Sequence, residues 1–388
     1  MKTGIMIVGL GGVNASVLIS GCIAMKLGVI PKQYGITASE DFLNLNLLDI
    51  DDLVFSGWDY FFKNQYELYK QYGIVKVAEQ EPFISELKAI LPYKGIHTEK
   101  DIQVESRFDY IAEIKHASEA ISVIEENIQD FKNRYQVSNV IVLYLGSPGK
   151  KVSPELKQLT YEDILKLPTD ALPSGLYYTV AAANCYAHFI DFTPSETLEF
   201  DFLHDLAKKK KVQLSGRDGS TGQTMLKLTL ANMLKIRNLK LRGWYSTNIL
   251  GNHDGYILSN PDYCKTKMED KKSGLAPLLG YDDFEHKVTI DFFKTRFDSK
   301  ESWDSIDFTG WMGTPMSLKV NWKGEDSILS APIILDLIRL IEFGIHYDLG
   351  GFQKQLGLFY KHPFYCEGQS LETMYRNLIL FYQKLITK

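Results

Sequence analysis

The sequence predicts an α/β protein that has a Rossmann-type dinucleotide-binding domain and an inserted α+β domain. The chain opens with an apolar run at residues 4–8, a glycine-rich turn at residues 9–14 and a helix-forming apolar segment at residues 16–25. A strand, a glycine turn and a helix in this order begin a dinucleotide-binding unit. A second apolar run, residues 140–145, has the composition of a buried parallel strand. Strand-like and helix-like segments then alternate, which indicates an α/β class.

The length of 388 residues fits two domains, or one large domain with an insertion. From Gly216 the sequence becomes rich in glycine and polar residues, and strand-like segments follow. An apolar run at residues 331–343 has the composition of a largely buried helix. We therefore predict that residues 1–224 and 326–388 form the dinucleotide-binding domain. Residues 225–325 would form the inserted catalytic and oligomerisation domain.

Composition excludes several classes of protein. The net charge of −5 argues against broad nucleic-acid binding, which needs a basic face. The four cysteines contain no CxxC pair, so neither a disulfide framework nor a zinc site is expected. No apolar run approaches the roughly 18 residues that span a bilayer, and no signal-peptide pattern begins the chain. We expect a cytoplasmic protein with no nucleic-acid or membrane partner, and no residues are predicted to bind a metal.

The first motif that carries chemistry is the N-terminal glycine turn. Glycines there allow backbone N–H groups to approach a pyrophosphate at a helix N-terminus. The residues expected to bind the cofactor are Gly9, Gly11, Gly12, Val13 and Asn14. The acidic residue expected about 20 positions later for the ribose is missing. Either the second strand is displaced along the chain or the ribose is held elsewhere.

A second candidate site precedes an apolar-periodic helix. Its residues are Thr221, Gly222, Gln223 and Thr224. The free N–H groups and the dipole of a helix N-terminus bind anions, and a sugar phosphate is a natural occupant. The alternative is a plain helix cap.

Lysines supply the candidate acid–base groups. Lys267 and Lys271 are four residues apart, so they share one helix face and lower each other's pKa. A lysine with a lowered pKa can transfer protons near neutral pH, although a solvated basic face would have the same spacing. Asp218 and Asp254 could orient such lysines. Lys300 follows a strand, where a loop lysine could meet a substrate.

The segment from Thr193 to Glu196 has a capping-box pattern with proline at the first helical position. We predict that a helix begins there and ends at residues 208–211, where lysines suit a helix C-terminus.

Several of these segments together resemble the myo-inositol-1-phosphate synthase (inositol-3-phosphate synthase) family. The resemblance covers most of the chain, is weak between residues 60 and 135, and rests on motifs in the family order. These motifs are GLGGVN at 9–14, SGWD at 56–59, GRDGSTGQT at 216–224, LGNHDGYIL at 250–258, KTKMEDK at 265–271, FDSK at 297–300 and EDSILSAPIILD at 325–336. The sequence departs from the family pattern at Arg217, at His253 and at Gly146–Gly149.

The resemblance implies a site. NAD would be the cofactor, and five further residues would help to bind it: Asp59, Thr193, Asp298, Asp326 and Ser327. Lys361 would join the catalytic set of Lys267, Lys271, Lys300, Asp218 and Asp254. The family forms homotetramers through the inserted domain. Its requirement for a divalent or monovalent cation varies, so the resemblance leaves that requirement open.

The implied reaction converts D-glucose 6-phosphate to 1D-myo-inositol 3-phosphate without net redox change. NAD+ oxidises C5, the ketone acidifies the C6 hydrogens, an enolate attacks the C1 aldehyde, and the hydride returns to C5. Lys267 would transfer the proton at C5, Lys300 would polarise the aldehyde oxygen and Lys271 would bind phosphate. The alternatives are an ordinary NAD(P)-dependent dehydrogenase, a related sugar-phosphate cyclase and a non-catalytic NAD-binding regulatory protein.

Overall fold

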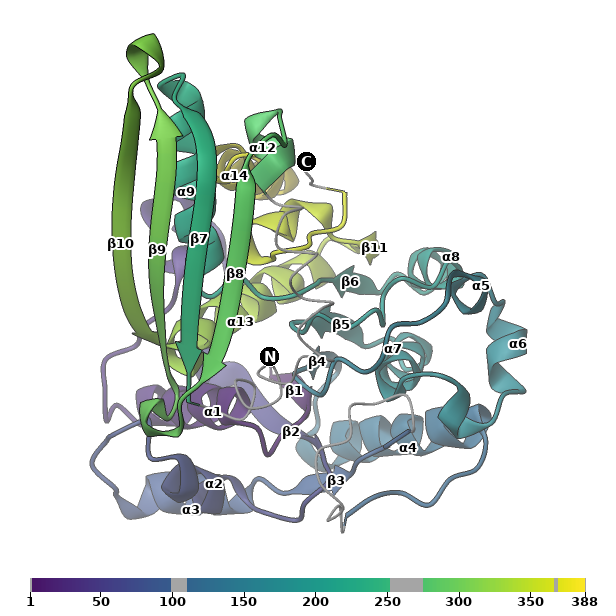
Figure 1. Ribbon diagram of the computed structural model, residues 1–388. Helices are drawn as coiled ribbons and strands as arrows, with labels where there is room; N and C mark the ends of the chain where they lie inside the picture. The colour runs from purple at the N-terminus through teal and green to yellow at the C-terminus, as the bar shows by residue number, and fades with distance from the viewer. Residues whose placement is uncertain (1, 99–109, 252–274, 366–368, 388) are drawn as a thin grey trace. The chain divides into compact units, whose positions relative to one another are not determined.

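The computed structural model of the protein describes residues 2–98, 110–251, 275–365 and 369–387. The chain divides into two compact units, whose elements are labelled in Figure 1. Unit 1 comprises Met1–Gly219, Ala331–Phe364 and Phe381–Lys388, and unit 2 comprises Ser220–Ser330 and Tyr365–Leu380. The dinucleotide-binding and catalytic roles of the two parts stay predictions.

Unit 1 is built on a seven-stranded parallel sheet in the order β11-β6-β5-β4-β1-β2-β3. Its strands are β1 Thr3–Val8, β2 Leu53–Asp59, β3 Pro92–Lys94, β4 Asn139–Tyr144, β5 His188–Asp191, β6 Gln213–Ser215 and β11 Gly351–Phe352. The strand order reverses between β1 and β4. In open α/β sheets a ligand binds at such a reversal, beyond the carboxyl ends of the strands. The predicted Rossmann-type fold is confirmed.

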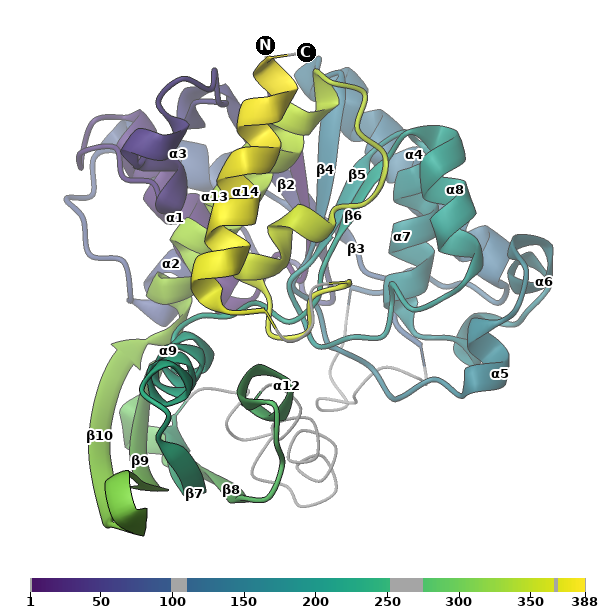
Figure 2. The same cartoon turned by 90° about the horizontal axis from the view of Figure 1, so that it is seen from above.

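Helices cover both faces of this sheet (Figure 2). They are α1 Val13–Lys26, α2 Gln65–Tyr72, α3 Glu81–Ala89, α4 Ala117–Tyr135, α5 Pro154–Lys157, α6 Tyr161–Leu165, α7 Ser174–Asn184 and α8 Phe202–Lys210. Helices α4, α7 and α8 share one core with the strands, in which Ile124, Val142 and Val180 are fully buried. Because β4 is covered on both faces, its apolar run is continuous rather than alternating.

Helix α13, Asp326–Ile345, includes the predicted helix at 331–343, and α14 spans Leu371–Ile386. Two buried side chains of α13 hold the segment between α1 and β2. Asp336 accepts a hydrogen bond from the backbone of Ile36 at 2.6 Å, and Arg339 donates one to the carbonyl of Leu48 at 2.8 Å. These contacts hold the long connection that lies between α1 and β2, which begins at Leu53.

Unit 2 contains a four-stranded sheet in the order β10-β9-β7-β8. Its elements are α9 Gln223–Ile236, β7 Lys240–Leu250, α12 Leu275–Leu279, β8 Glu285–Phe292, β9 Ser299–Thr309 and β10 Pro315–Glu325. Strands β9 and β10 and strands β7 and β9 are antiparallel, and β7 and β8 are parallel. Helices α9 and α12 pack on one face of the sheet, where Ala231, Leu234, Trp244 and Ile306 are buried together.

Short 3-10 turns connect the elements: η1 Ile36–Ala38, η2 Glu40–Phe42, η3 Ile50–Asp52, η4 Thr169–Ala171, η5 Lys294–Arg296, η6 Trp311–Gly313 and η7 Lys354–Phe359. The predicted helix start at Thr193 is wrong, because α8 begins at Phe202 and residues 192–201 are irregular. Its end at Lys210 agrees with the prediction. Within the described ranges, no helix is long and apolar enough to cross a membrane.

Candidate active site

The glycine turn lies at the carboxyl end of β1, beside the strand-order reversal. Gly9 has φ +85°, and a Cβ there would stand 3.0 Å from the carbonyl oxygen of Leu145, which follows β4. Only glycine allows this approach without strain. The backbone N–H groups of Gly9 and Leu10 donate to the carbonyl of Trp58 at 3.0 Å, and Gly12 caps α1. The turn therefore presents the start of α1, a place where anions bind, at the ligand-binding edge of the sheet.

Asp59 is the last residue of β2, and β2 pairs with β1. Its carboxylate accepts hydrogen bonds from the backbone of Gly11 at 2.6 Å, Tyr60 at 2.8 Å and Phe61 at 3.1 Å. Burial raises the pKa of Asp59, and these three bonds oppose that shift. Asp59 therefore ends the second strand of the sheet, although that strand is displaced along the chain, and its predicted cofactor role stays a prediction. An acid at the end of this strand is placed to bind a ribose 2′-hydroxyl.

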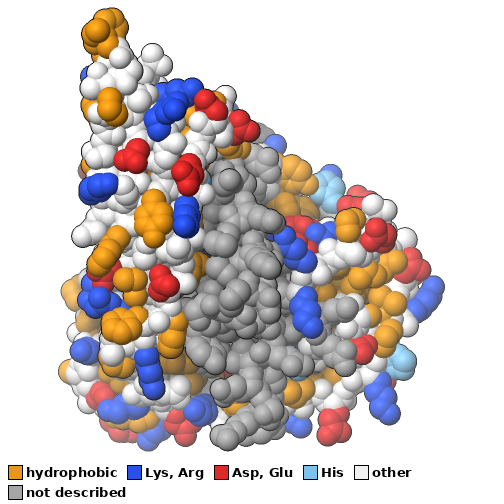
Figure 3. Space-filling model, viewed as in Figure 1, with side chains coloured by type: hydrophobic (Ala, Val, Ile, Leu, Met, Phe, Trp, Pro, Cys, Tyr) orange, Lys and Arg blue, Asp and Glu red, His pale blue; other side chains and the backbone are white. Residues whose placement is uncertain are grey.

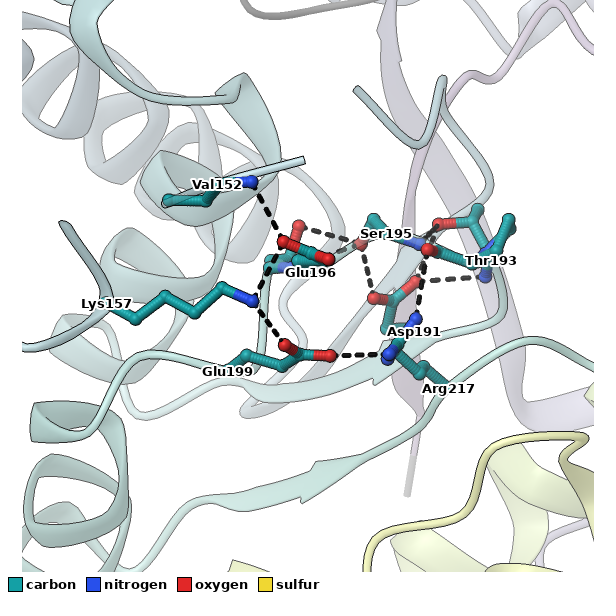
Figure 4. A network of polar contacts seen from close by, with 10 residues as sticks. Val152, Lys157, Asp191, Thr193, Ser195, Glu196, Glu199 and Arg217 are labelled. Carbon is teal, nitrogen blue, oxygen red and sulfur yellow. Dashed lines mark hydrogen bonds and ion pairs between the residues drawn. The ribbon is translucent and has the colours of Figure 1, made fainter. Parts of the chain in front are cut away.

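A buried aspartate organises the carboxyl end of β5. Asp191 is fully buried and accepts hydrogen bonds from Thr193 N at 2.9 Å, Thr193 Oγ1 at 2.8 Å and Ser195 Oγ at 2.6 Å (Figure 4). Burial raises the pKa of Asp191 to about 7, and its hydrogen bonds and Arg217 oppose the rise. The hydroxyl of Thr193 is thus committed to Asp191 rather than to a helix cap. Asp191 is not among the site residues predicted from the sequence, although it directly follows the apolar residues Phe189 and Ile190.

Arg217 replaces an acidic residue of the family pattern, and its contacts explain how it is accommodated. It pairs with Glu199 at 2.5 Å and donates to the carbonyl of Pro194 at 3.2 Å. Lys157 lies between Glu199, at 2.6 Å, and Glu196, at 2.9 Å (Figure 4). Arg217 is therefore neutralised within a half-buried network.

Asp218 and Lys361 form an ion pair although 143 residues separate them in the sequence. Lys361 Nζ lies 2.8 Å from Asp218 Oδ1, and the backbone N–H of Lys361 donates to the Asp218 carbonyl at 2.7 Å. The backbone N–H of Asp218 donates to the carbonyl of Thr193 at 2.9 Å. Unit 1 thus brings three predicted site residues together, and Asp218 orients Lys361.

In unit 2 the predicted phosphate turn lies at the start of α9, as expected, but two of its side chains already have partners. Thr221 Oγ1 donates to Asp326 Oδ1 at 2.8 Å. Gln223 Nε2 donates to Ser246 Oγ at 2.7 Å. Gly222 caps the helix, and a Cβ there would stand 2.8 Å from the ring of Trp322. The groups of α9 that could bind an anion are therefore the backbone N–H groups of its first turn.

Three residues predicted to bind the cofactor lie in unit 2, at or near the start of α13. Asp298 Oδ2 accepts hydrogen bonds from the backbone N–H of Ser327 at 3.2 Å and from its hydroxyl at 2.5 Å. Burial raises the pKa of Asp298. Asp326 is the first residue of α13. These contacts hold the helix start, and the predicted cofactor role of all three residues stays a prediction.

Lys300 lies within β9 rather than in a loop, opposite Leu250 of β7. A second lysine, which the sequence reasoning missed, lies on α9. Lys227 Nζ is 3.3 Å from His286 Nε2 and 5.7 Å from the ring centre of Trp244. Burial lowers the pKa of Lys227 to about 8, and nearby Asp304 opposes the shift. In the sequence, Lys227 lies in an amphipathic helical pattern, and nothing in that pattern indicates that its side chain is buried.

Lys267, Lys271 and Asp254, together with the departure at His253, lie outside the described residues. Their predicted roles are therefore not tested. In the part of the chain that is described, no three histidine, cysteine or acidic side chains gather as a metal site.

The strand order, the glycine turn and the acid at the end of β2 are those of the Rossmann type of fold, in which dinucleotides bind at the strand-order reversal. The family model of myo-inositol-1-phosphate synthase matches residues 222–327, all of which lie in unit 2. Inositol-3-phosphate synthase 1 of Bacteroides thetaiotaomicron is 32% identical over 386 residues, covering 93% of this chain and 89% of that enzyme. The chain belongs to the inositol-3-phosphate synthase family.

Other comparisons agree with this assignment. Inositol-3-phosphate synthase isozyme 1 of Arabidopsis thaliana is 26% identical, over 88% of this chain and 74% of that protein. The crystal structure of the Caenorhabditis elegans inositol-3-phosphate synthase superposes with a TM-score of 0.85 at 24% identity, covering 99% of this chain and 86% of that one. A myo-inositol-1-phosphate synthase-related protein from Thermotoga maritima superposes with a TM-score of 0.79 at 19% identity, covering 99% of both chains. These two structures support the fold.

Proposed function

We propose that the protein is an isomerase that converts D-glucose 6-phosphate to 1D-myo-inositol 3-phosphate with NAD. The observation that carries the proposal is the similarity to the Bacteroides thetaiotaomicron synthase, which extends over 93% of the chain and hence over both units. NAD supplies a hydride acceptor and then a hydride donor at C5, so the reaction has no net redox change. The protein must bind an open-chain sugar phosphate, exclude water and stabilise the oxyanions that develop.

The residues of unit 1 fit NAD. The Gly9 backbone packs closely against the loop after β4, where a Cβ would collide with Leu145, and the turn presents the N–H groups at the start of α1 to a pyrophosphate. A carboxylate has about four acceptor positions, and Asp59 uses three of them for its backbone donors, so it can still accept from a ribose hydroxyl. A fixed negative charge at this position would repel the 2′-phosphate of NADP. We therefore expect NAD to be preferred over NADP.

The lysines would supply the electrostatic chemistry. Lys361 is held by Asp218, so its ammonium is pre-oriented as a cation for an oxyanion. Lys300 would polarise the aldehyde oxygen, Lys267 would transfer the proton at C5 and Lys271 would bind phosphate. The N–H groups of the first turn of α9 would hold the same phosphate.

We also propose a homotetramer that forms through unit 2. The sheet face opposite α9 carries exposed aromatic side chains, with Tyr245 45% and Trp303 50% exposed. At the turn between β9 and β10, Trp311 and Met312 are each 88% exposed. Figure 3 shows hydrophobic side chains gathered over these strands. Exposed apolar patches of this kind mark protein–protein interfaces. Sedimentation of a Trp303→Ser variant, which should shift towards smaller species, tests this assembly.

One incubation separates the candidate reactions. Purified protein is mixed with glucose 6-phosphate and NAD+, and both inositol phosphate and NADH are measured. The proposed synthase gives inositol phosphate without accumulation of NADH. A dehydrogenase would accumulate NADH, a related cyclase would release a different cyclic product, and a regulatory binding protein would produce neither. The expected cytoplasmic location is tested by fractionation of the source cells.

A further inference from the structure

The glycine turn between β1 and α1 uses its own backbone N–H groups inside the protein. Those of Gly9 and Leu10 donate to a backbone carbonyl of β2 at 3.0 Å. The N–H of Gly11 donates to the Asp59 carboxylate at 2.6 Å, and that of Gly12 donates to the carbonyl of Gly9 at 3.0 Å. A pyrophosphate at this edge would therefore lie against the first turn of α1, whose N–H groups have no partner within the helix.

Two side chains of α2 hold the carbonyl groups of the same turn. Gln65 Nε2 donates to the carbonyl of Leu10 at 2.8 Å, and the Gln65 side chain is fully buried. The hydroxyl of Tyr72 donates to the carbonyl of Gly11 at 2.6 Å. Burial and the nearby charge of Asp59 raise the pKa of Tyr72 to about 12. The Tyr72 hydroxyl therefore keeps its proton at neutral pH and remains a donor.

The position of α2 brings both donors to the turn. Gln65 is the first residue of this helix and Tyr72 is the last, so about two helical turns separate them and they share one face. Helix α2 packs against α1 (Figure 1). A capping box at Asn64 begins α2, and Gly73, with φ +62°, ends it. The two donors thus stand at the two fixed ends of one short helix.

Each of the two bonds fixes a peptide group whose other side is also bonded. The peptide between Leu10 and Gly11 is held at its carbonyl by Gln65 and at its N–H by Asp59. The next peptide is held at its carbonyl by Tyr72 and at its N–H by the turn itself. Glycine has more conformational freedom than any other residue, so a glycine turn without these bonds would sample other peptide orientations.

We propose that Gln65 and Tyr72 are positioning residues for the cofactor, which keep the glycine turn in its binding conformation before NAD arrives. This inference rests on the proposed function, because NAD is the ligand. Neither side chain is required to touch NAD. A site that is already formed binds its ligand more tightly, because no affinity is lost to the population of other conformations. The proposed reaction oxidises and then reduces the same sugar, so tight retention of the cofactor suits it.

The test compares Tyr72→Phe with Tyr66→Phe by isothermal calorimetry with NAD. Tyr66 lies on the same helix, and its hydroxyl donates to Glu79 at 2.8 Å, away from the glycine turn. Each variant therefore loses one hydroxyl and one hydrogen bond, but only Tyr72→Phe releases the turn. In Tyr72→Phe we expect the dissociation constant for NAD to rise roughly two- to tenfold, which is the population that one neutral hydrogen bond controls. Tyr66→Phe should bind NAD with wild-type affinity.

A second variant, Gln65→Leu, tests the other bond. It keeps a buried side chain of similar size and removes the donor to Leu10, so it should weaken NAD binding by a similar factor. The number of NAD sites per chain, which the same titration measures, separates positioning from damage. A partly unfolded protein would bind less NAD per chain, whereas a displaced turn raises the dissociation constant and leaves the number of sites unchanged.

Four results would overturn the proposal. They are wild-type NAD affinity in folded Tyr72→Phe, wild-type NAD affinity in folded Gln65→Leu, equal weakening in Tyr66→Phe, and a loss that appears only as fewer sites per chain. A wild-type protein that does not bind NAD would overturn this inference and the proposed reaction together. A protein that binds NAD and responds to these substitutions as expected, but yields no inositol phosphate, would contradict the proposed reaction alone.

Discussion

Replacing Gly11 by alanine should weaken NAD binding through Asp59. A Cβ on Gly11 would stand 2.8 Å from Asp59 Oδ2 and 2.9 Å from Asp59 Cγ, closer than such atoms approach in proteins. The carboxylate cannot simply retreat, because the backbone of Tyr60 and Phe61 holds its other oxygen. The Gly11→Ala variant must therefore break or stretch the 2.6 Å bond from the Gly11 N–H to Asp59.

The size of the effect follows from that bond. A hydrogen bond to a charged group contributes about 1.5–3 kcal/mol. If NAD binding requires the carboxylate in its present position, loss of this bond should raise the dissociation constant for NAD roughly 10- to 150-fold. Calorimetric titration with NAD measures the change directly.

Gly21→Ala is the matched control. Gly21 lies in the same helix that follows the turn, and a Cβ there meets no atom within 4 Å. This variant should bind NAD normally and gain up to about 1 kcal/mol of stability. On an Asp59→Ala background, Gly11→Ala should add little further loss. A folded Gly11→Ala protein with wild-type NAD affinity, or a full additional loss on the Asp59→Ala background, would refute the role of the Gly11–Asp59 contact.

Two further predictions concern protons. Lys267→Ala should lower turnover at least roughly a hundredfold and leave folding and NAD binding intact. The control variant Lys272→Ala should have little effect on turnover. Equal losses in the two variants would indicate that these lysines form a solvated basic face. Burial raises the pKa of Asp191 from 3.8 to about 7, so between these pH values the folded state holds a proton that the unfolded state releases. Asp191 should therefore make the folded state less stable as pH rises from about 4 to about 7. The free energy of unfolding, measured with denaturant across this pH range, should rise in Asp191→Asn relative to wild type as pH rises. A difference that does not change with pH would contradict the raised pKa of Asp191.

The opening of unit 1 could be predicted because its signals are local. An apolar run, a glycine turn and an apolar helix are contiguous in the sequence, and the structure has β1, the turn and α1 in these positions. The position of β2 could not be predicted in the same way. A long connection precedes it, and that connection is held by Asp336 and Arg339, which lie nearly 300 residues away in the sequence. For that reason Asp59 could be nominated only from the family resemblance.

The candidate site shows the same division between local and distant causes. The pattern at Thr193 to Glu196 predicts a helix cap, but the buried carboxylate of Asp191 takes the hydroxyl of Thr193 instead. Pairing of Asp218 with Lys361 cannot be deduced from spacing, because the contact is made only when β6 and the segment after η7 meet. The opposition of Leu250 and Lys300 likewise depends on strand register. Amphipathic patterns fix which face a residue occupies, but they do not fix its neighbour across the sheet.

The edge strand β11 has a consequence for the order of folding during synthesis. It pairs with β6, and the backbone N–H groups of Gly351 and Gln353 donate to Val212 and Leu214 at 2.8 and 2.9 Å. Most of unit 2 is encoded between these two partners. A ribosome therefore releases six strands of the first sheet, then nearly all of the second unit, before the closing strand emerges. A nascent chain halted before β11 should hold an open sheet edge at β6, where chaperones or another unfinished chain can bind.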